Sequence, residues 1–190
     1  MLNYWMFPRP IRKLHTIPQE IAIFAEIMME GEWAKNREQH RAFENALEVG
    51  DLKRKGPRRE GSGSGGRTHA VLLKALGLTF QQSGTKKTFL TMAGQALADG
   101  LSPVPILAHQ ILKYQFPSAY SIGRNVRVAE RFKVRPFVFM FRLLDDIRIG
   151  HLTQEEIAKV VLVYADSEKD SCYEDVVRRI QEFRLHGNAS

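Results

Sequence analysis

Residues 67–100, RTHAVLLKALGLTFQQSGTKKTFLTMAGQALADG, decide the fold expected for this chain. The apolar residues in the first third of this stretch recur at helical spacing and form one stripe. Thr68 is a good N-cap for that helix, because its hydroxyl can accept a hydrogen bond from a free backbone N–H. Gly77 is suited to end it, because glycine adopts the left-handed conformation at little cost. The pattern predicts a helix between these two residues.

A short hairpin is expected directly after this helix. Residues 78–80 and 88–91 favour strands, and residues 82–85 favour a turn. Thr91 then caps a short helix that ends at Gly100. The order of helix, strand, turn, strand and helix is typical of a winged helix-turn-helix, which usually contacts DNA with the start of its helix and the tip of its hairpin. A small α+β subdomain with solvated lysines is the alternative interpretation.

The composition indicates a globular protein, and no membrane-spanning segment is expected. The chain has 190 residues, of which 44% are hydrophobic and 26% charged. No apolar run is long enough to span a bilayer, and the N-terminus lacks the order of charges and apolar residues of a signal peptide. Cys172 is the single cysteine, which excludes an internal disulfide. A cytoplasmic protein is expected.

Positive charge is concentrated in the first two thirds of the chain. Residues 1–135 hold roughly two Lys or Arg for each Asp or Glu, whereas residues 136–190 hold more acidic than basic residues. A net charge of +7 distributed in this way predicts one surface that faces a polyanion and one that faces solvent or a partner.

The segments before residue 67 predict a scaffold and a loop. Residues 1–18 are rich in aromatics and proline and are expected to lie extended across a core. Helices are expected over 18–31 and 35–49. Residues 50–66, GDLKRKGPRREGSGSGG, are basic and rich in glycine and serine, so a mobile loop is expected there. Its position before the proposed recognition helix favours contacts with phosphate groups.

The C-terminal half predicts a second helical subdomain. Helices are expected to start at Pro103 and Pro136, and the last helix to run over about 172–184. Thr153 and Glu156 have the spacing of a capping box. The outline resembles a second helix-turn-helix with mostly acidic exposed residues, which suits packing or docking. The predicted domains are 1–101 and 102–190, each winged-helix or helix-turn-helix-like, in a mainly α protein with a small β-wing.

No catalytic or metal-binding residue is predicted within the chain. Asp51-Leu52-Lys53 matches half of the D-x-K motif of metal-dependent nucleases, but it ends a helix and lacks the strands that would bring a second carboxylate to the metal. The adjacent Asp145 and Asp146 diverge on a helix. The chain has no phosphate-binding loop, no H-E-x-x-H motif and no paired Cys and His.

With these motifs in view, the chain resembles the N-terminal DNA-recognition region of the AlwI-type type IIS restriction endonucleases, a family that includes strand-nicking endonucleases. K-Y-Q-F-P-S and R-P-F-V-F are the most specific parts of the likeness. The residues that carry it are Asn3-Tyr4-Trp5 with Pro8 and Pro10, Gly31-Glu32-Trp33, Gln39 to Leu47, Arg67 to Phe80, Leu90 to Ala98, Leu112 to Ser118, Arg135 to Phe139, Leu143-Leu144, Leu152-Thr153, Ile157-Ala158, and Ile180 to Arg184.

The resemblance implies a recognition region of a restriction-modification system. Two helical, winged-helix-like subdomains would bind a short asymmetric site in double-stranded DNA. In the family, a linker and a separate nuclease domain with a P-D…D/E-x-K site follow. We therefore expect Mg²⁺ to belong to that domain, present in cis or in trans, and no cofactor in this chain. Residues 50–66 depart from the family pattern.

Hypothetical DNA contacts follow from these positions. Arg67, Thr68 and His69, at the expected start of the recognition helix, are predicted to contact base edges. The predicted phosphate contacts are Lys53, Arg54, Lys55, Arg58, Arg59, Lys74, Lys86, Lys87, Arg124, Arg127 and Arg131. Two other classes stay open: a free-standing winged-helix regulator, and a small Mg²⁺-dependent nuclease that uses Asp51 and Lys53.

Overall fold

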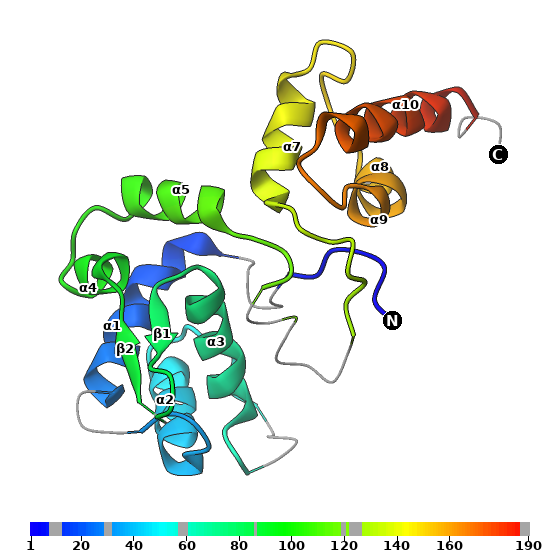
Figure 1. The fold of residues 1–190 in the computed structure, drawn as a ribbon. Coiled ribbons are helices and arrows are strands. Elements are labelled where there is room, and N and C mark those ends of the chain that lie inside the picture. The colour runs from blue at the N-terminus through cyan, green and yellow to red at the C-terminus, as the bar shows by residue number, and fades with distance from the viewer. Residues whose placement is uncertain are drawn as a thin grey trace. The chain divides into compact units, whose positions relative to one another are not determined.

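The computed structural model describes most of the chain as two compact units. Unit 1 consists of Met1–Phe7 and Ile111–Ser190, and unit 2 of Pro8–Gln110 (Figure 1). The prediction with a boundary at residue 101 assigned residues 1–7 to the first domain. In the structure these residues pack in unit 1, with the C-terminal part of the chain. The described residues are 1–7, 13–28, 32–56, 61–85, 87–118, 121 and 127–186.

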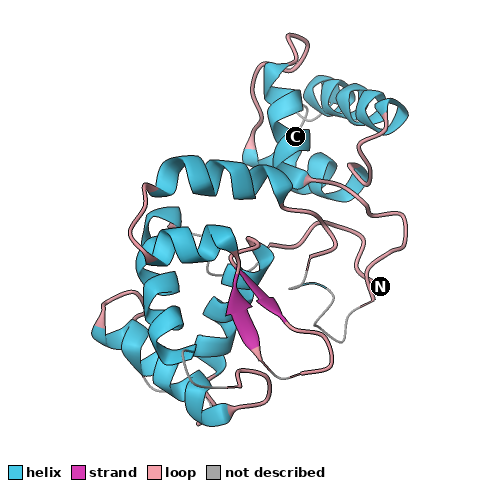
Figure 2. Cartoon of the chain, turned by 60° about the vertical axis from the view of Figure 1, so that its left-hand side comes forward, coloured by secondary structure: helices cyan, strands magenta, loops and turns pink. Residues whose placement is uncertain are grey.

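Helices dominate both units, as the sequence predicts. The strands assigned among the described residues form one two-stranded antiparallel sheet (Figure 2). None of the helices described is both long and apolar enough to cross a bilayer. Unit 2 contains η1 (Leu14–Thr16), α1 (Ile17–Met28), α2 (Arg37–Val49), α3 (Ser64–Ala75), β1 (Thr79–Gln81), β2 (Thr88–Leu90), α4 (Met92–Ala98) and most of α5 (Pro103–Lys113).

The hairpin β1–β2 and the cap of α4 confirm the predictions for this stretch. Phe80 pairs with Phe89 at the centre of the hairpin. The Thr91 hydroxyl accepts a hydrogen bond from the backbone N–H of Gly94 at 3.1 Å, which starts α4. Gly77 has the expected positive φ of 69° after α3. Local sequence signals therefore determine this part of unit 2.

The predicted start of α3 at Thr68 is wrong, because the helix begins one turn earlier at Ser64. Gly63 is its N-cap, with a φ of 75°. The glycine-rich run is not the mobile loop expected for residues 50–66: a Cβ on Gly66 would lie 2.3 Å from the carbonyl oxygen of His40 in α2. Gly63 and Gly66 are thus the small residues that let α3 approach α2 closely.

Aromatic packing between α1 and α2 forms the core of unit 2. The Phe24 ring lies 5.2 Å from that of Phe43 and 5.0 Å from that of Trp33, measured between ring centroids. Ile21, Phe24, Phe43 and Leu47 are at most 1% exposed. The helix α3 packs against both α1 and α2.

Unit 1 is built from helices around a second core. Its elements are α7 (Pro136–Asp145), α8 (Gln154–Glu156), the π-helical turn η2 (Ile157–Val161), α9 (Leu162–Tyr164) and α10 (Asp170–His186). Pro136 occupies the first turn of α7, as predicted. Buried residues of α7, η2 and α10 pack together.

The N-terminal segment is extended and packs in unit 1. The backbone N–H of Leu2 donates to the carbonyl of Arg127 at 2.7 Å, and that of Trp5 to the carbonyl of Leu162 at 2.9 Å. The indole N–H of Trp5 donates to the carbonyl of Ala165 at 2.6 Å, and its side chain is 2% exposed. The prediction of an extended segment over residues 1–18 is confirmed for residues 1–7; residues 14–16 instead form η1, residues 17 and 18 begin α1, and residues 8–12 lie outside the described part of the chain.

Glu156 joins the capping box of α8 to α10. The backbone N–H of Thr153 donates to Glu156 Oε2 at 2.7 Å, which confirms the predicted box. Arg184 Nε donates to Glu156 Oε1 at 2.6 Å. Burial alone would raise the pKa of Glu156, but the bonds from Arg184 and Thr153 outweigh it and hold that pKa below its usual value.

Acid is therefore expected to weaken unit 1 through Glu156. A carboxylate whose pKa is lowered by folding stabilises the fold above its unfolded pKa and loses this contribution as the pH falls through the folded value. Glu156→Gln should lower the free energy of unfolding by about 2 kcal/mol at pH 7. The difference between the two proteins should shrink below about pH 4.5. Urea unfolding followed by circular dichroism across pH 3–7 measures it.

Glu155→Gln is the matched control for this prediction. Its carboxylate is 68% exposed and lies 3.4 Å from Lys159, so its removal should have little effect at any pH. A Glu156→Gln effect that does not vary with pH would contradict the linkage.

Candidate nucleic-acid interface

A groove in unit 2 lies where one face of α3 meets one face of the hairpin. Its volume is about 240 Å³. The α3 residues that line it are spaced three or four apart, so they share a face of the helix. The hairpin residues that line it project from one side of the ladder. The lining consists of Phe24, Trp33, Ala34, Lys35, His40, Arg67, Ala70, Val71, Lys74, Thr79, Gln81 and Thr88.

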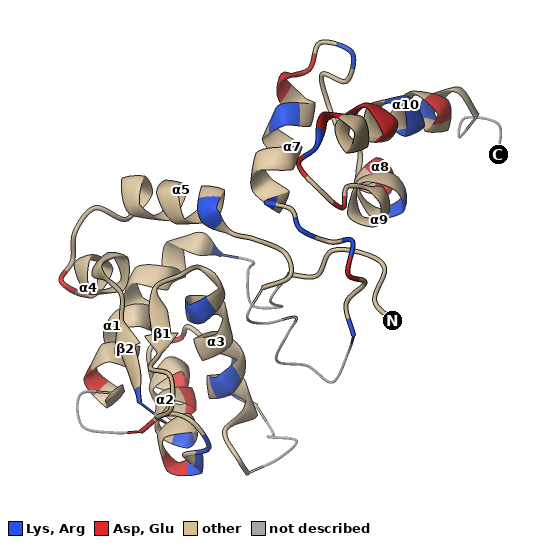
Figure 3. Cartoon of the chain, viewed as in Figure 1, with Lys and Arg blue, Asp and Glu red and all other residues tan. Residues whose placement is uncertain are grey.

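Among the described residues that line this groove, the charged ones are all basic. Lys35, Arg67 and Lys74 contribute the cations. Neither α3 nor residues 79–90 contain an Asp or Glu, and Figure 3 shows two basic bands and no acidic band on α3. Lys74 is exposed and forms no ion pair among the described residues. The groove therefore presents positive charge beside polar hairpin residues.

The three predicted base-contact residues lie within α3 instead of at its exposed start. Arg67 Nη1 donates to the carbonyl and hydroxyl oxygens of Ser62 at 2.9 and 3.0 Å. The Thr68 hydroxyl donates to the carbonyl of Ser64 at 2.8 Å. His69 Nδ1 lies 2.9 Å from a carboxylate oxygen of the buried Glu20. Of the three, only Arg67 lines the groove.

Lys53 is held by acidic residues of α2. Its ammonium group lies 3.1 Å from Glu44 Oε1 and 2.6 Å from Glu48 Oε1. Burial alone would lower the pKa of Lys53, but the two carboxylates outweigh it and raise that pKa. The positive charge of Lys53 is thus already paired within unit 2, and its role as a phosphate contact stays a prediction.

The structure describes only some of the other predicted phosphate contacts. Arg54, Lys55, Lys87 and Arg127 are exposed, as a phosphate contact requires. The residues that lie outside the described part of the chain are Arg58, Arg59, Lys86 and Arg124.

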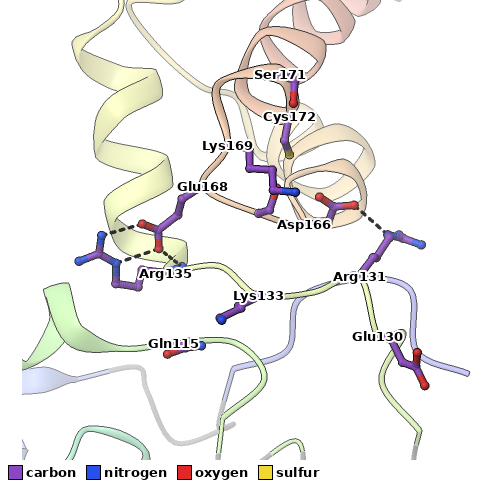
Figure 4. A pocket seen from close by; sticks show the side chains of 11 residues that line it. Gln115, Glu130, Arg131, Lys133, Arg135, Asp166, Glu168, Lys169, Ser171 and Cys172 are labelled. Atoms are coloured by element: carbon purple, nitrogen blue, oxygen red, sulfur yellow. Dashed lines mark hydrogen bonds and ion pairs between the residues drawn. The ribbon is translucent and has the colours of Figure 1, made fainter.

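Arg131 lines a wide cleft in unit 1 of about 970 Å³ (Figure 4). Its Nε lies 3.3 Å from Asp166 Oδ2, and its Nη2 donates to the carbonyl of Val163 at 3.1 Å. On the same cleft, Arg135 Nη2 lies 2.6 Å from Glu168 Oε2. Both guanidinium groups thus tie the chain before α7 to the segment before α10. Arg131 is therefore ion-paired within unit 1, and its role as a phosphate contact stays a prediction.

Sequence reasoning missed His40 and Trp33 on the wall of the unit 2 groove. The His40 ring N–H at Nε2 donates to the carbonyl of Trp33 at 2.9 Å, and the side chain is 5% exposed. Burial, aided by the positive charge of Arg67, lowers the pKa of His40, so the ring is neutral at pH 7. The Nδ1 atom has no hydrogen-bond partner within the part of the chain that the structure describes. No local motif predicts the contact between Trp33 and His40, because it depends on how the turn at 33–36 folds back on α2.

The Asp51 and Lys53 of the possible nuclease motif do not form a shared site. Asp51 is exposed with a φ of 54°, whereas the Lys53 ammonium group lies against α2. Within the ranges that the structure describes, no three His, Cys, Asp or Glu side chains are grouped to hold a metal ion.

Comparison of the chain with models of protein families gave no match, and comparison with curated proteins gave none either. The family expectation stands on the motifs quoted above.

Proposed function

We propose that unit 2 binds double-stranded DNA through the groove between α3 and the hairpin. The observation that carries this proposal is the charge of that groove: Arg67, Lys74 and Lys35 line it, and none of the described residues that line it is acidic. A basic surface on a helix and a neighbouring hairpin matches the negative charge of a duplex and the width of its major groove.

The proposal extends to the type of protein. The motif likeness favours the recognition region of a type IIS restriction or nicking endonuclease. A nuclease domain, in cis or in trans, would then bind Mg²⁺ and cut the DNA to one side of the recognised site. Within this chain the task is to select the site.

Selection from a pool of random duplexes tests the proposal directly. The purified chain should enrich one short asymmetric motif, and its affinity for that motif should fall steeply with salt. Absence of enrichment, together with no salt-dependent binding to any duplex, would reject DNA binding.

Two substitutions in α3 separate positioning from sequence reading. Lys74→Ala should weaken binding to all duplexes by several-fold and reduce the salt slope by about one. Arg67→Ala should instead relax the preference at one base pair, because an Arg can bind guanine through two hydrogen bonds. Fluorescence titration on the selected duplex and on single-position variants measures both.

Lys159→Ala is the control, since this exposed lysine belongs to unit 1. Equal losses on specific and random duplexes for Arg67→Ala would remove Arg67 from base reading and leave it as a phosphate contact.

A further inference from the structure

Two short extended segments lie side by side in the wall of the cleft in unit 1. Lys133 and Ser167 form an isolated parallel bridge, and the backbone N–H of Lys133 donates to the carbonyl of Asp166 at 2.7 Å. Phe132 and Val134, on either side of Lys133, are at most 3% exposed. Because side chains alternate along an extended chain, Lys133 projects away from that core, and its bridge partner Ser167 projects to the same side. Both residues line the cleft.

Two carboxylates in the wall of the cleft are already paired with arginine. Glu168 accepts hydrogen bonds from Arg135 Nε at 2.8 Å and from the backbone N–H of Arg135 at 2.9 Å. The guanidinium group of Arg135 holds the pKa of Glu168 below its usual value, so Glu168 is ionised at pH 7. Asp166 is paired with Arg131 in the same way. Figure 4 shows both ion pairs, with Lys133 on the chain between the two arginines. Each pair balances its own charge.

The cleft also holds two lysine and two serine side chains whose donor groups are unused. These residues are Lys133, Ser167, Lys169 and Ser171. Within the described ranges of the chain, their ammonium and hydroxyl groups form no ion pair and no hydrogen bond. Lys133, Lys169 and Ser171 are exposed. Among the described lining residues, Glu130 is the one carboxylate outside the two ion pairs, so the unpaired lysines outnumber it. The cleft therefore carries a small positive charge and presents donors to solvent.

The charge pattern of this cleft favours a small anion over a duplex. A duplex carries its phosphates along a continuous track, which would also meet the carboxylates of Glu130, Asp166 and Glu168. A small anion can instead contact the two unpaired lysines alone. The volume of about 970 Å³ lies within the range of roughly 300–1,000 Å³ that small-molecule sites occupy. Lysine ammonium and serine hydroxyl groups are donors that bind phosphate oxygens.

We propose that the cleft of unit 1 binds a phosphate dianion, either free or carried by a small molecule. The two unpaired lysines pair with the phosphate oxygens, and the two serine hydroxyls donate hydrogen bonds to them. A phosphomonoester carries a charge of about −1.5 to −2 at pH 7, which two ammonium groups balance. This site goes beyond the DNA binding proposed for unit 2 and does not depend on it.

Calorimetric titration of the full chain with inorganic phosphate and with adenosine monophosphate tests the proposal. Wild type should bind inorganic phosphate and should not bind adenosine, which lacks the phosphate group. Tighter binding of adenosine monophosphate than of phosphate would identify a small phosphomonoester as the ligand, and the reverse order would identify the free ion. Lys133→Gln and Lys169→Gln should each weaken phosphate binding by at least about tenfold, because each removes a charged donor. Circular dichroism verifies the fold of each variant.

Lys159→Gln is the matched control, because this lysine of unit 1 is 60% exposed and lies outside the cleft. It removes the same charge and should bind phosphate like wild type. No binding of either anion, or an equal loss in Lys159→Gln and Lys133→Gln, would overturn the proposal. Binding of a random duplex that Lys133→Gln and Lys169→Gln both weaken, with no binding of either small anion, would assign the cleft to DNA and overturn it as well. The titrations contain no DNA, so a failure of DNA binding by unit 2 leaves their result unchanged.

Discussion

Trp5→Ala is expected to lower the free energy of unfolding of unit 1 by about 3–5 kcal/mol. The indole is 2% exposed, and its N–H donates to the carbonyl of Ala165. Its ring also packs edge-on against Phe139 of α7 at a centroid distance of 6.1 Å. Truncation would remove this apolar contact, open a cavity and leave the Ala165 carbonyl without the indole donor.

The chain offers a built-in way to measure this effect. It has two tryptophans, Trp5 in unit 1 and Trp33 in unit 2. In Trp5→Ala, the fluorescence of Trp33 reports on unit 2 alone, while circular dichroism follows both units. The ellipticity should gain an early unfolding phase, and the Trp33 midpoint should stay near that of wild type. Trp5→Phe keeps an apolar ring but not the N–H, so it should destabilise unit 1 less than Trp5→Ala does. A Trp33 midpoint that moves with the ellipticity would contradict independent units.

Gly66→Ala is expected to destabilise unit 2 by about 3 kcal/mol. The added Cβ would lie 2.3 Å from the carbonyl oxygen of His40 and 3.2 Å from the backbone nitrogen of Glu44. Both atoms belong to the backbone of α2, so no side-chain rotation relieves the clash and α3 must move outwards. Since Arg67 is the next residue along α3, the groove should change shape as well.

Gly56→Ala is the control for this substitution, because no described atom beyond its chain neighbours lies within 4 Å of the Cβ it would add. Trp33 fluorescence during urea unfolding gives the stability of unit 2, since Trp33 packs against His40 and Phe43 of α2. A Gly66→Ala midpoint equal to that of Gly56→Ala would contradict the close contact of the two helices.

Local signals in the sequence predicted the elements that depend only on their neighbours. The Thr91 cap, the hairpin around the turn at 82–85 and the box formed by Thr153 and Glu156 are each decided within a few residues. In such places the hydrogen-bonding side chain and the backbone group it satisfies lie within one turn.

These local signals do not predict contacts between segments that are distant in the sequence. Glycines at 63 and 66 indicate a loop when taken alone, yet here their lack of a side chain admits the backbone of α2. The partner of Trp5 lies 160 residues away. No periodicity in either segment specifies that pairing.

The sequence predicted the charge of the candidate site and two of the cations that line it, Arg67 and Lys74, but not its other lining residues. Sequence placed cations before and within α3, but whether each is available depends on acids supplied from elsewhere. Glu44 and Glu48 neutralise Lys53, and Asp166 does the same for Arg131. Lys74 is exposed and forms no ion pair with a described carboxylate.

The discontinuous course of unit 1 has a consequence for synthesis on the ribosome. Unit 2 is one uninterrupted segment. Met1–Phe7 cannot pack in unit 1 until residues after 110 have been synthesised. Trp5 cannot meet Ala165 until 160 more residues have been added, which takes roughly 8–32 s at the usual rates of translation. During that interval Leu2 and Trp5 are exposed to chaperones that bind apolar segments, while unit 2 is free to fold. The unit with the basic groove can therefore be complete on the nascent chain before Trp5 is buried.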